Sequence, residues 1–577
     1  MKSRDRKGGR RNASRPAQRP ADPTAVSAST PTQPPAGAAR RDAPAWSSGG
    51  TTASLFDRWF VPVAIVILLV AAVLRLPELA LNPFHHDEGV NGFFTTNLVR
   101  DGLYHYDPAN YHGPSLYYFA LVSEVLFGLT TEAMRLVPVV FGMLLVGLAF
   151  PLRRYLGSPA ALVAGGLLAV SPGAVYISRY FIHEVLLVAF SLALVVAAMY
   201  YLDRREAKYL LLAAVAAALL FTTKETGIIT VVVLLIAVVV GHYYTIWRNR
   251  AAVGAESAVR AGARPTTRAK TVWIDGVEYR ATGPAGPAAR STTSFWPGSI
   301  PGEHLAGAIV VFLVVYVLLY SSFFTNFPDG LVDSLATFTI WTQTGEATQV
   351  QPPWKYLEWM IRSELPILLL GVGGGLIAAI RAPSRLWVVI GLWAAGITAA
   401  YSIIQYKTPW ITLNMLLPLA LLAGLAIDTL WSARSLRLGV PVVLGAAVVL
   451  SGYQAIDLNF RHYDDETYPY VFVHSTRDML NLVDQIEATA ALAGTGTETG
   501  VVIVSPDYWP LPWYLRDYPR AGFFGTIVET EEAMIVANVN QEAELAPAID
   551  GRYDRAGTFN LRPGVDLVLF IRTDVPR

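Results

Sequence analysis

The chain has 577 residues, of which 53% are hydrophobic and only 15% charged, and its mean hydropathy is +0.39. These values exclude an ordinary soluble domain and predict a polytopic membrane protein. The absence of cysteine excludes disulfides and thiolate chemistry. The net charge of +1 says little about partners, and we expect no nucleic acid among them.

The first 55 residues are rich in Pro, Ala, Ser and Arg and lack apolar periodicity, which predicts a disordered cytoplasmic tail. The apolar segment that follows the tail has no small-residue cleavage pattern. We therefore expect it to remain as a membrane anchor instead of being removed as a signal peptide.

A helix that crosses a bilayer needs about 20 mainly apolar residues. About eleven segments meet this requirement, namely 59–76, 135–151, 159–177, 185–202, 208–222, 226–246, 304–324, 365–380, 385–404, 410–430 and 437–455. A further segment, 115–129, is short and carries Glu124, so we interpret it as a helix at the interface. The expected fold class is an α-helical polytopic membrane protein with a transmembrane domain over 56–455.

Lys and Arg collect in alternate loops, and positively charged loops stay cytoplasmic. The basic segments are the tail and the loops 153–154, 204–208, 248–290, 381–385 and 434–437. This pattern predicts a cytoplasmic N-terminus. The outer face then holds the loop 77–134, the turns 178–184, 222–226 and 405–409, the loop 325–364, and everything after 456.

Two regions outside the spans have their own character. Residues 456–577 predict a small extracytoplasmic α/β domain, with strands near 501–504 and 567–571 and a helix over 478–491. Residues 247–302 predict a largely flexible cytoplasmic insertion, in which only 271–279 indicates a short hairpin.

The outer segments carry polar side chains that could perform chemistry. The run His85-His86-Asp87-Glu88 follows the first apolar segment, and ionisable clusters at a membrane surface are functional candidates. The other candidates are His112 in the same loop, Arg179 and Glu184, Lys224, and Lys407. All of them lie on outer turns in the predicted topology.

These residue types suit a transfer reaction at the outer leaflet. A carboxylate, Asp87 or Glu88, would deprotonate an acceptor hydroxyl as general base. Cations would stabilise a phosphate leaving group. The candidate phosphate ligands are Arg179, Lys224 and Lys407, and we assign His86 and His112 to substrate binding as well.

Several motifs carry a resemblance to a known family. They are His-His-Asp-Glu-Gly-Val-Asn at 85–91, Tyr-His-Gly-Pro-Ser-Leu-Tyr-Tyr at 111–118, Arg-Leu-Val-Pro at 135–138, and Ser-Pro at 171–172 before an Arg-Tyr and an acid. Over residues 59–240 the chain resembles the membrane glycosyltransferases of the GT-C superfamily. It looks most like the branch of protein mannosyltransferases and aminoarabinose lipid A transferases, and within it like a group described as flippase-associated in archaeal N-glycosylation and also found in bacteria.

The resemblance implies roles for particular residues. The first-loop aspartate of the superfamily, the proposed base, corresponds to Asp87, and the acid of the next outer loop corresponds to Glu184. The implied donor is a sugar on polyprenyl phosphate, transferred with inversion to a lipid, glycan or protein acceptor. Relatives often have a basic residue directly before Pro-Pro, where this chain has His112-Gly113-Pro114-Ser115.

Each candidate also has a structural alternative. The alternatives are a helix-capping pair for Asp87 and Glu88, a head-group anchor for Arg179, an ion pair with Arg179 for Glu184, mutual neutralisation of Lys224 and Glu225, and an interface anchor for Lys407. The aromatic residues Tyr508, Trp509, Trp513 and Tyr514 form either a sugar-stacking platform or part of the outer domain's core.

The leading functional hypothesis is a polyprenyl-phosphate-dependent glycosyltransferase at the outer face of the membrane. The alternative is a transporter, flippase or accessory protein for lipid-linked sugars without catalysis. No cofactor is assigned. A divalent metal held by His85, His86 and Asp87 is a candidate, but adjacent histidines are a weak signal for a metal site.

Overall fold

The computed structural model describes residues 55–110, 112–262, 271–274, 277–280, 300–343, 350–381 and 384–576. The predicted tail lies outside these residues except for Leu55, and so does the part of the predicted insertion from 281 to 299.

The first half of the membrane part is a series of helices. They are α1 (Leu55–Arg75), α2 (His86–Asp101), α3 (Ser115–Phe127), α4 (Thr131–Leu148), α5 (Arg153–Leu156), α6 (Ser158–Val170), α7 (Pro172–Ser178), α8 (Glu184–Arg204), α9 (Ala207–Phe221) and α10 (Gly227–Gly262). Helix α3 has 13 residues and confirms the short helix predicted within the first outer loop.

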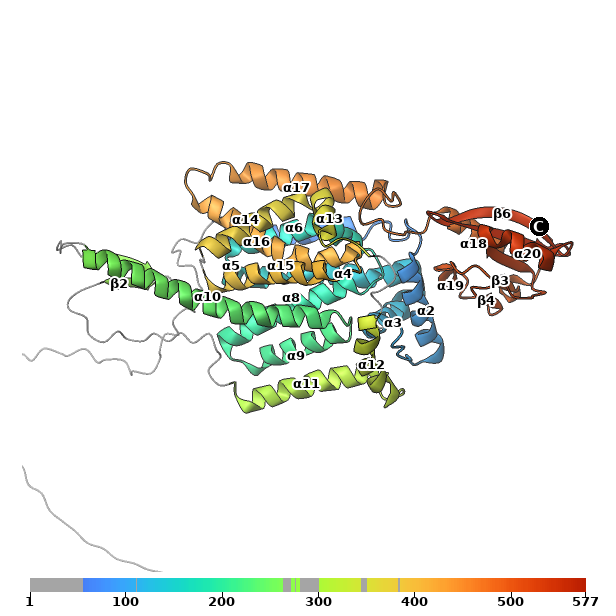
Figure 1. Ribbon diagram of the computed structural model, residues 1–577, viewed down its shortest axis with the longest axis horizontal. Helices are drawn as coiled ribbons and strands as arrows, with labels where there is room; N and C mark the ends of the chain where they lie inside the picture. The colour runs from blue at the N-terminus through green and yellow to red at the C-terminus, as the bar shows by residue number, and fades with distance from the viewer. Residues whose placement is uncertain are drawn as a thin grey trace, which may run out of the picture. The chain divides into compact units, whose positions relative to one another are not determined.

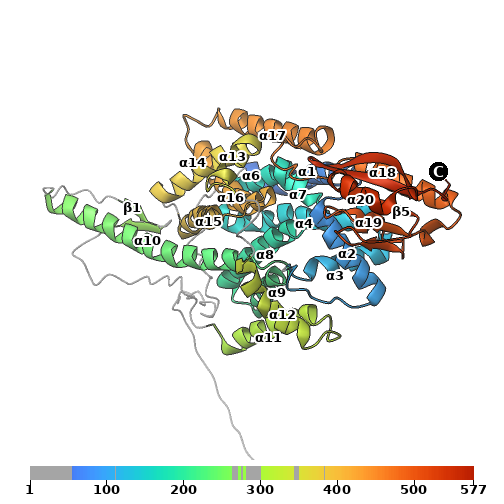
Figure 2. The ribbon, with the colours of Figure 1, turned by 45° about the vertical axis from the view of Figure 1, so that its right-hand side comes forward.

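The series continues in the second half. The helices are α11 (Gly302–Tyr320), α12 (Asp329–Gln343), α13 (Lys355–Ser363), α14 (Leu365–Arg381), α15 (Arg385–Ile403), α16 (Thr412–Ser432) and α17 (Val440–Ile456). In Figures 1 and 2, α11 lies at the margin of the bundle beyond α9.

Eight helices of the described residues are long and apolar enough to cross a membrane, or up to ten if each of two bent pairs counts as one span. The bent pairs are α6 with α7, at 63°, and α13 with α14, at 116°. A helix occupies each predicted span, but α9 has only 15 residues and falls short of the length of a span. The prediction of a polytopic helical membrane protein is confirmed.

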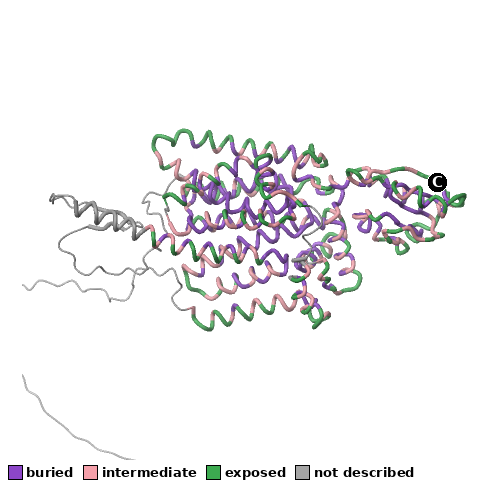
Figure 3. Tube along the Cα trace, in the orientation of Figure 1, coloured by how far each residue is buried: buried purple, intermediate pink, exposed green. Residues whose placement is uncertain are grey.

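Helix α16 forms the centre of the bundle. All its residues from Thr412 to Ile427 are buried, whereas α11 buries only Ala308 and Tyr320 among its 19 residues. Helices α6, α14 and α15 pack around α16, and the centre of the bundle is mainly purple, the colour of buried residues, in Figure 3. A helix that is apolar all round needs protein or lipid around it, and α16 is surrounded by other helices.

The two bends meet each other inside the bundle. At the first bend Pro172 lacks a backbone N–H, and the hydroxyl of Ser171 accepts from the N–H of Ala174 at 3.1 Å to cap α7. Glu364, at the second bend, accepts hydrogen bonds from the Ser171 hydroxyl and from the backbone N–H of Gly173, the latter at 2.6 Å. One buried carboxylate at the second bend therefore satisfies polar groups that the first bend releases.

Basic turns contact one another at one end of the bundle. Arg154 pairs with Asp203 at 2.6 Å, and Arg385 donates to the hydroxyl of Thr245 at 3.3 Å. Arg248 donates to backbone carbonyls at the end of α14. Helices α8 and α9 each lead from the basic turn between them to the turns that carry Glu184 and Lys224, so these two turns lie at the other end of both helices.

The C-terminal segment contains a five-stranded sheet in the order β4-β3-β5-β7-β6. Its elements are α18 (Asp478–Leu492), β3 (Val501–Ile503), α19 (Leu511–Tyr514), β4 (Ala521–Phe523), β5 (Met534–Asn538), α20 (Glu542–Ile549), β6 (Tyr553–Arg562) and β7 (Val565–Arg572). Neighbouring residues of β3 face opposite sides, so Val501 packs in one core and Val502 in another. The predicted small α/β unit is confirmed, while its boundary at 456 stays a prediction.

The insertion after α10 differs in part from the expectation. Helix α10 continues to Gly262, well beyond the predicted end at 246. The strands β1 (Thr271–Ile274) and β2 (Val277–Arg280) pair antiparallel and confirm the predicted hairpin.

Candidate functional site

One cavity of about 490 Å³ collects polar side chains from four separate segments that the sequence predicts on the outer face. The polar and aromatic residues that line it are His86, Asp87, Asn91, Asn110, His112, His183, Glu184, Lys224, Glu225, Thr226, Tyr401, Tyr406, Thr408 and Trp410. Five predicted site residues therefore lie together, namely His86, Asp87, His112, Glu184 and Lys224. Glu88, Arg179 and Lys407 are not among the lining residues.

The first turn of α2 brings His86 and Asp87 to the cavity. The N-cap residue is His85, whose ring Nδ1 accepts a hydrogen bond from the backbone N–H of Asp87 at 3.0 Å. Its Nε2 bonds to the carbonyl of Phe472 at 2.9 Å. Because burial lowers the pKa of His85 well below its ordinary range, the ring stays neutral and can cap the helix.

Glu88 completes this capping box, and both oxygens of its carboxylate accept hydrogen bonds. Its carboxylate accepts from the backbone N–H of His85 at 3.0 Å and of Phe181 at 2.7 Å, and it pairs with Arg135 at 2.7 and 2.5 Å. The side chain of Glu88 is 0% exposed. All four donors to the Glu88 carboxylate are protein groups, which suits a structural role at the start of α2, and the catalytic role assigned to Glu88 stays a prediction.

Arg135 ties the same carboxylate to the first outer loop. Its guanidinium donates to the carbonyls of Leu79 and Asn82, both at 2.7 Å, and of Pro83 at 3.1 Å. The Glu88–Arg135 pair therefore fixes the start of α2 to the chain that leads into it.

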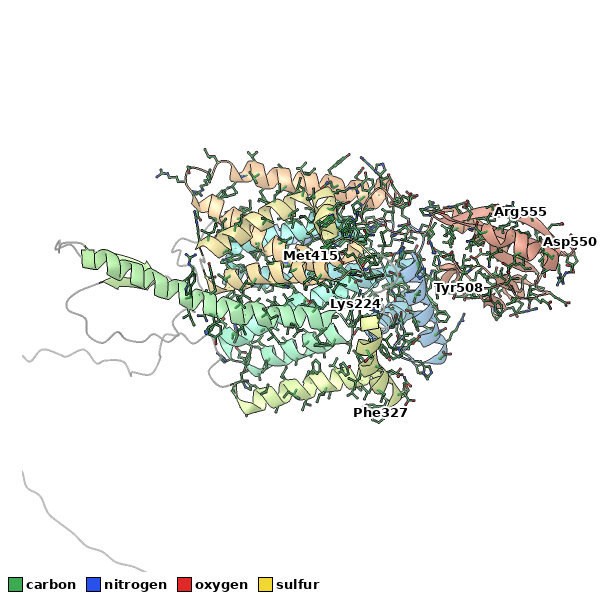
Figure 4. The ribbon with its side chains drawn as sticks, viewed as in Figure 1. Lys224, Phe327, Met415, Tyr508, Asp550 and Arg555 are labelled. Carbon is green, nitrogen blue, oxygen red and sulfur yellow. The ribbon has the colours of Figure 1, made fainter. Side chains whose placement is uncertain are left out.

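Lys224 enters the cavity from the turn between α9 and α10, where Figure 4 labels it. Its ammonium pairs with Glu184, and both side chains are buried. Although burial opposes the charge of Lys224, Glu184 and Glu225 raise the pKa of Lys224 above its ordinary value. Among the described residues that line the cavity, Lys224 carries the only permanent positive charge.

The run 112–115 packs directly on this turn. Gly113 donates its N–H to the carbonyl of Thr223 at 3.1 Å, and Ser115 donates to that of Thr222 at 3.0 Å. A Cβ on Gly113 would lie 2.1 Å from the Thr222 carbonyl oxygen, so this close approach requires glycine. The contact brings the His112 ring within 3.1 Å of the Glu225 carboxylate.

Lys407 does not reach the cavity, although its neighbours Tyr406 and Thr408 do. Its buried ammonium donates to the carbonyls of Ser402 at 3.0 Å, of Tyr401 at 3.4 Å, and of Ile404. Those carbonyls end α15, where the helix dipole favours a cation. These contacts suit a helix-capping role for Lys407, and its phosphate contact stays a prediction.

Arg179 also lies elsewhere and closes the start of the first outer loop. It donates to the carbonyls of Arg75 at 3.1 Å, Pro77 at 2.6 Å and Glu78 at 2.9 Å. Its guanidinium covers the ring of Phe460 at 4.7 Å. Arg179 therefore lies outside the cavity, and its assignment to substrate binding stays a prediction. Glu184 pairs with Lys224 and not with Arg179.

Sequence reasoning missed several residues of the cavity. Asn91 lies one helical turn after Asp87 and binds the carbonyl of Phe181 at 2.9 Å through its side-chain amide. His183 and Glu225 are sequence neighbours of the predicted Glu184 and Lys224, and that adjacency was the available signal. No three His, Asp or Glu side chains within the described part of the chain form a group that could hold a metal ion.

A comparison with family models gives one match. A model described as dolichyl-phosphate-mannose-protein mannosyltransferase matches residues 111–259, which include the run at 112–115, the acid Glu184 and Lys224. No curated protein matches the chain.

Solved structures match over most of the chain. ArnT from Cupriavidus metallidurans bound to undecaprenyl phosphate has a TM-score of 0.59 at 17% identity, covering 91% of this chain and 100% of that one. The apo state of the same enzyme gives 0.57 at 18% identity, covering 89% and 97%. The Archaeoglobus fulgidus oligosaccharyltransferase in complex with Zn and sulfate gives 0.50 at 13% identity, covering 87% and 73%.

At identities this low, the structural matches establish a common fold. They confirm the predicted resemblance and the predicted fold class. In sequence over residues 111–259, and in fold over nearly its whole length, this multi-pass membrane protein is similar to the membrane glycosyltransferases of the GT-C superfamily.

Proposed function

We propose that the chain transfers a sugar from a polyprenyl-phosphate donor to an acceptor hydroxyl at the outer face of the membrane. The observation that carries this proposal is the convergence of Asp87, His112, Glu184 and Lys224 from separate turns on one cavity. A carboxylate base and a cation that line one cavity meet the two electrostatic needs of glycosyl transfer from a phosphate.

In the proposed reaction Asp87 accepts the proton of the acceptor hydroxyl. The hydroxyl oxygen forms a bond to the anomeric carbon of the donor sugar. The bond from that carbon to the phosphate oxygen breaks on the opposite side, and polyprenyl phosphate leaves with the electron pair. Attack opposite to the leaving group inverts the anomeric configuration.

Asp87 suits the role of base by its position. Its side chain is 42% exposed in the first turn of α2, and no hydrogen bond to any described residue occupies its carboxylate. Glu88, Arg135 and His85 fix the backbone on either side of it. Asp87 therefore has a fixed place and a free carboxylate.

Lys224 is the proposed ligand of the donor phosphate. Its pKa is raised, so the ammonium stays charged at neutral pH and can offset the charge of the departing phosphate. Glu184 holds Lys224 in place and acts in this proposal as a positioning residue. His86 and His112 line the same cavity and supply neutral or charged ring nitrogens to the sugar or phosphate.

An apolar groove of about 730 Å³ suits the lipid part of the donor. It runs between α10, α14, α15 and α16 and is lined mainly by apolar side chains such as Val240, Leu376 and Leu392. The groove reaches Ser402 at the end of α15, and the cavity begins at Tyr401 and Ile404. A polyprenyl chain in the groove would thus place its phosphate at the cavity.

The orientation of the chain is part of the proposal. The basic turns contact one another at one end of the bundle, which the positive-inside rule assigns to the cytoplasm together with the N-terminus. The cavity and the C-terminal domain then lie on the extracytoplasmic side, where the acceptor is a lipid, a glycan or a protein.

The test uses proteoliposomes that hold the full chain and a labelled polyprenyl-phosphate sugar, supplied with membrane extract as the acceptor source. We expect the wild type to form glycosylated product and release polyprenyl phosphate, and Asp87→Asn to form none. Asp101→Asn, an exposed aspartate at the end of the same helix, is the matched control and should retain turnover. Translocation of the labelled donor without product would contradict the proposal and favour a transporter.

A further inference from the structure

Aromatic rings form a continuous series from the cavity to the edge of the C-terminal sheet. The series, here called the aromatic track, consists of Phe93, Trp509, Tyr508 and Phe523. Neighbouring ring centroids lie 5.9 Å apart for Phe93 and Trp509, and 5.5 Å for each of the next two pairs. Trp509 also lies 6.2 Å from the ring of His86, which lines the cavity.

The track is accessible along its length. Phe93 is 40% exposed at one end, and Phe524, next to the other end, is 53% exposed. Trp509, Tyr508 and Phe523 are half-buried. Tyr508, labelled in Figure 4, belongs to the loop that joins β3 to α19.

The structure divides the four aromatic residues that the sequence grouped as one candidate platform. Trp513 is only 1% exposed and packs against Gly92 of α2, where a Cβ would lie 2.6 Å from its ring. The hydroxyl of Tyr514 accepts from the backbone N–H of Phe84 at 2.8 Å. Trp513 and Tyr514 therefore dock the loop, while Tyr508 and Trp509 stay half-buried, with one side of Tyr508 packed against the core of the C-terminal sheet.

Close packing holds the track against α2. A Cβ on Gly89 would lie 2.5 Å from the Cβ of Pro510 and 3.3 Å from the ring of Trp509. Gly89 lies two residues after Asp87, so the helix that carries the proposed base also seats the track. This contact gives Trp509 a fixed place relative to Asp87.

Polar groups accompany the aromatic faces. Asp507 and Arg562 form an ion pair whose side chains are 38% and 13% exposed. Burial lowers the pKa of His86, Asp87 and Asp507 act to raise it, and Arg562 acts to lower it. Asp507 also precedes Trp509 by only two residues. Half-buried aromatic faces with hydrogen-bonding groups along one edge match a ligand that is apolar on its faces and polar at its rim.

A saccharide has this chemistry, because its ring carries C–H groups on its faces and hydroxyls around its edge. We propose that the aromatic track binds the saccharide part of a glycan acceptor and leads its terminal hydroxyl past His86 to Asp87. An acyl chain would require a lining without the Asp507–Arg562 pair, and a peptide would pair with the edge strand β4. The proposal rests on the proposed function and deepens it by naming the acceptor class.

The test measures binding on the full-length Asp87→Asn protein in nanodiscs, which separates acceptor binding from turnover. The probes are mannan, arabinan and galactan oligosaccharides, with Ser/Thr peptides as the competing class. We expect a saccharide to bind saturably. Adding Trp509→Ala should lower its affinity about tenfold, which corresponds to about 1.4 kcal/mol for one lost aromatic contact.

Two further variants separate lost stacking from misfolding. Trp509→Phe keeps a ring and should retain most of the affinity. Trp59→Ala removes a tryptophan that is 52% exposed on α1, far along the chain from the track, and should bind like the parent. Failure of every saccharide to bind, binding that ignores Trp509→Ala, or binding of peptides alone would overturn the proposal. If saccharide binds but the wild type turns over no donor, the proposed function fails and the track stands.

Discussion

The ion pair between Glu88 and Arg135 offers a sharp test of how the site is built. Replacing Glu88 by Gln removes the buried negative charge and leaves the shape of the side chain nearly unchanged. The Arg135 guanidinium then keeps its three carbonyl acceptors but loses its counterion in a place where both side chains are 0–3% exposed. We expect the start of α2, and Asp87 with it, to lose its fixed geometry.

The size of the effect follows from the contacts. The Glu88 carboxylate accepts four hydrogen bonds, two of them from Arg135 at 2.7 and 2.5 Å. Removing one partner of a buried ion pair costs about 3–5 kcal/mol, because the other charge remains desolvated and unpaired. Removing both charges avoids this cost, so Glu88→Gln with Arg135→Gln should recover much of the lost stability.

The assay is thermal unfolding of the purified protein in detergent, paired with turnover of the labelled donor. Glu132→Gln, an exposed acid in the first turn of α4, is the matched control and should unfold like the wild type. Glu88→Gln should unfold at a clearly lower temperature and lose turnover in parallel. If Glu88→Gln unfolded like the wild type yet lost all turnover, Glu88 would act in the chemistry and the positioning argument would be wrong.

Three further predictions concern other parts of the site. Lys224→Met should abolish donor turnover and weaken polyprenyl-phosphate binding about tenfold or more by titration, with Lys224→Arg retaining part of both; unchanged binding would remove Lys224 from the phosphate site. Gly92→Val should lower thermal stability by about 1–3 kcal/mol because its side chain meets Trp513, whereas Gly147→Ala, in open space, should not. The pKa of His85 is lower in the folded protein than its unfolded value of about 6.5, so the stability that neutral His85 contributes above about pH 6.5 is lost as the pH falls below that value. His85→Asn should therefore make the melting temperature depend less on pH between neutral and acidic conditions. An unchanged pH dependence would refute this role.

The helices of the predicted spans could be read from the sequence because hydropathy is a local signal. The charge pattern is local as well, and the side it gives to each turn stays a prediction. An apolar run of sufficient length forms a membrane helix wherever it lies, and the alternation of basic loops assigns the turns to two sides. Asp87, Glu184 and Lys224 were therefore placed on one side from the sequence. Their meeting in one cavity also required the helix packing around α16.

The sequence could not show which charged side chains would be paired inside the fold, because their partners are distant in sequence. Glu88 finds Arg135 on another helix, and its capping partner His85 binds Phe472. Lys407 meets the carbonyl groups at the end of α15, and that local contact was obscured because its aromatic neighbours also fit an interface anchor. A charged residue on a predicted outer turn indicates a functional site only when the folded protein leaves it accessible to a ligand.

The contribution of the C-terminal domain was hidden for a similar reason. Trp509 follows Asp87 by more than 400 residues, yet its ring contacts His86 and its neighbour Pro510 contacts Gly89. Composition identifies an aromatic-rich loop but does not say which rings become core. The small residues Gly89 and Gly92 were the available signal, since they leave room on one face of α2 for a partner.

The most direct test of the central claim is a structure of the Asp87→Asn protein with a polyprenyl-phosphate sugar bound. The account predicts that the phosphate lies within hydrogen-bonding distance of Lys224, about 2.7–3.2 Å, that the sugar fills the cavity beside residue 87, and that the lipid follows the groove between α10 and α14–α16. A phosphate bound away from Lys224, or a sugar outside the cavity, would contradict the proposed site.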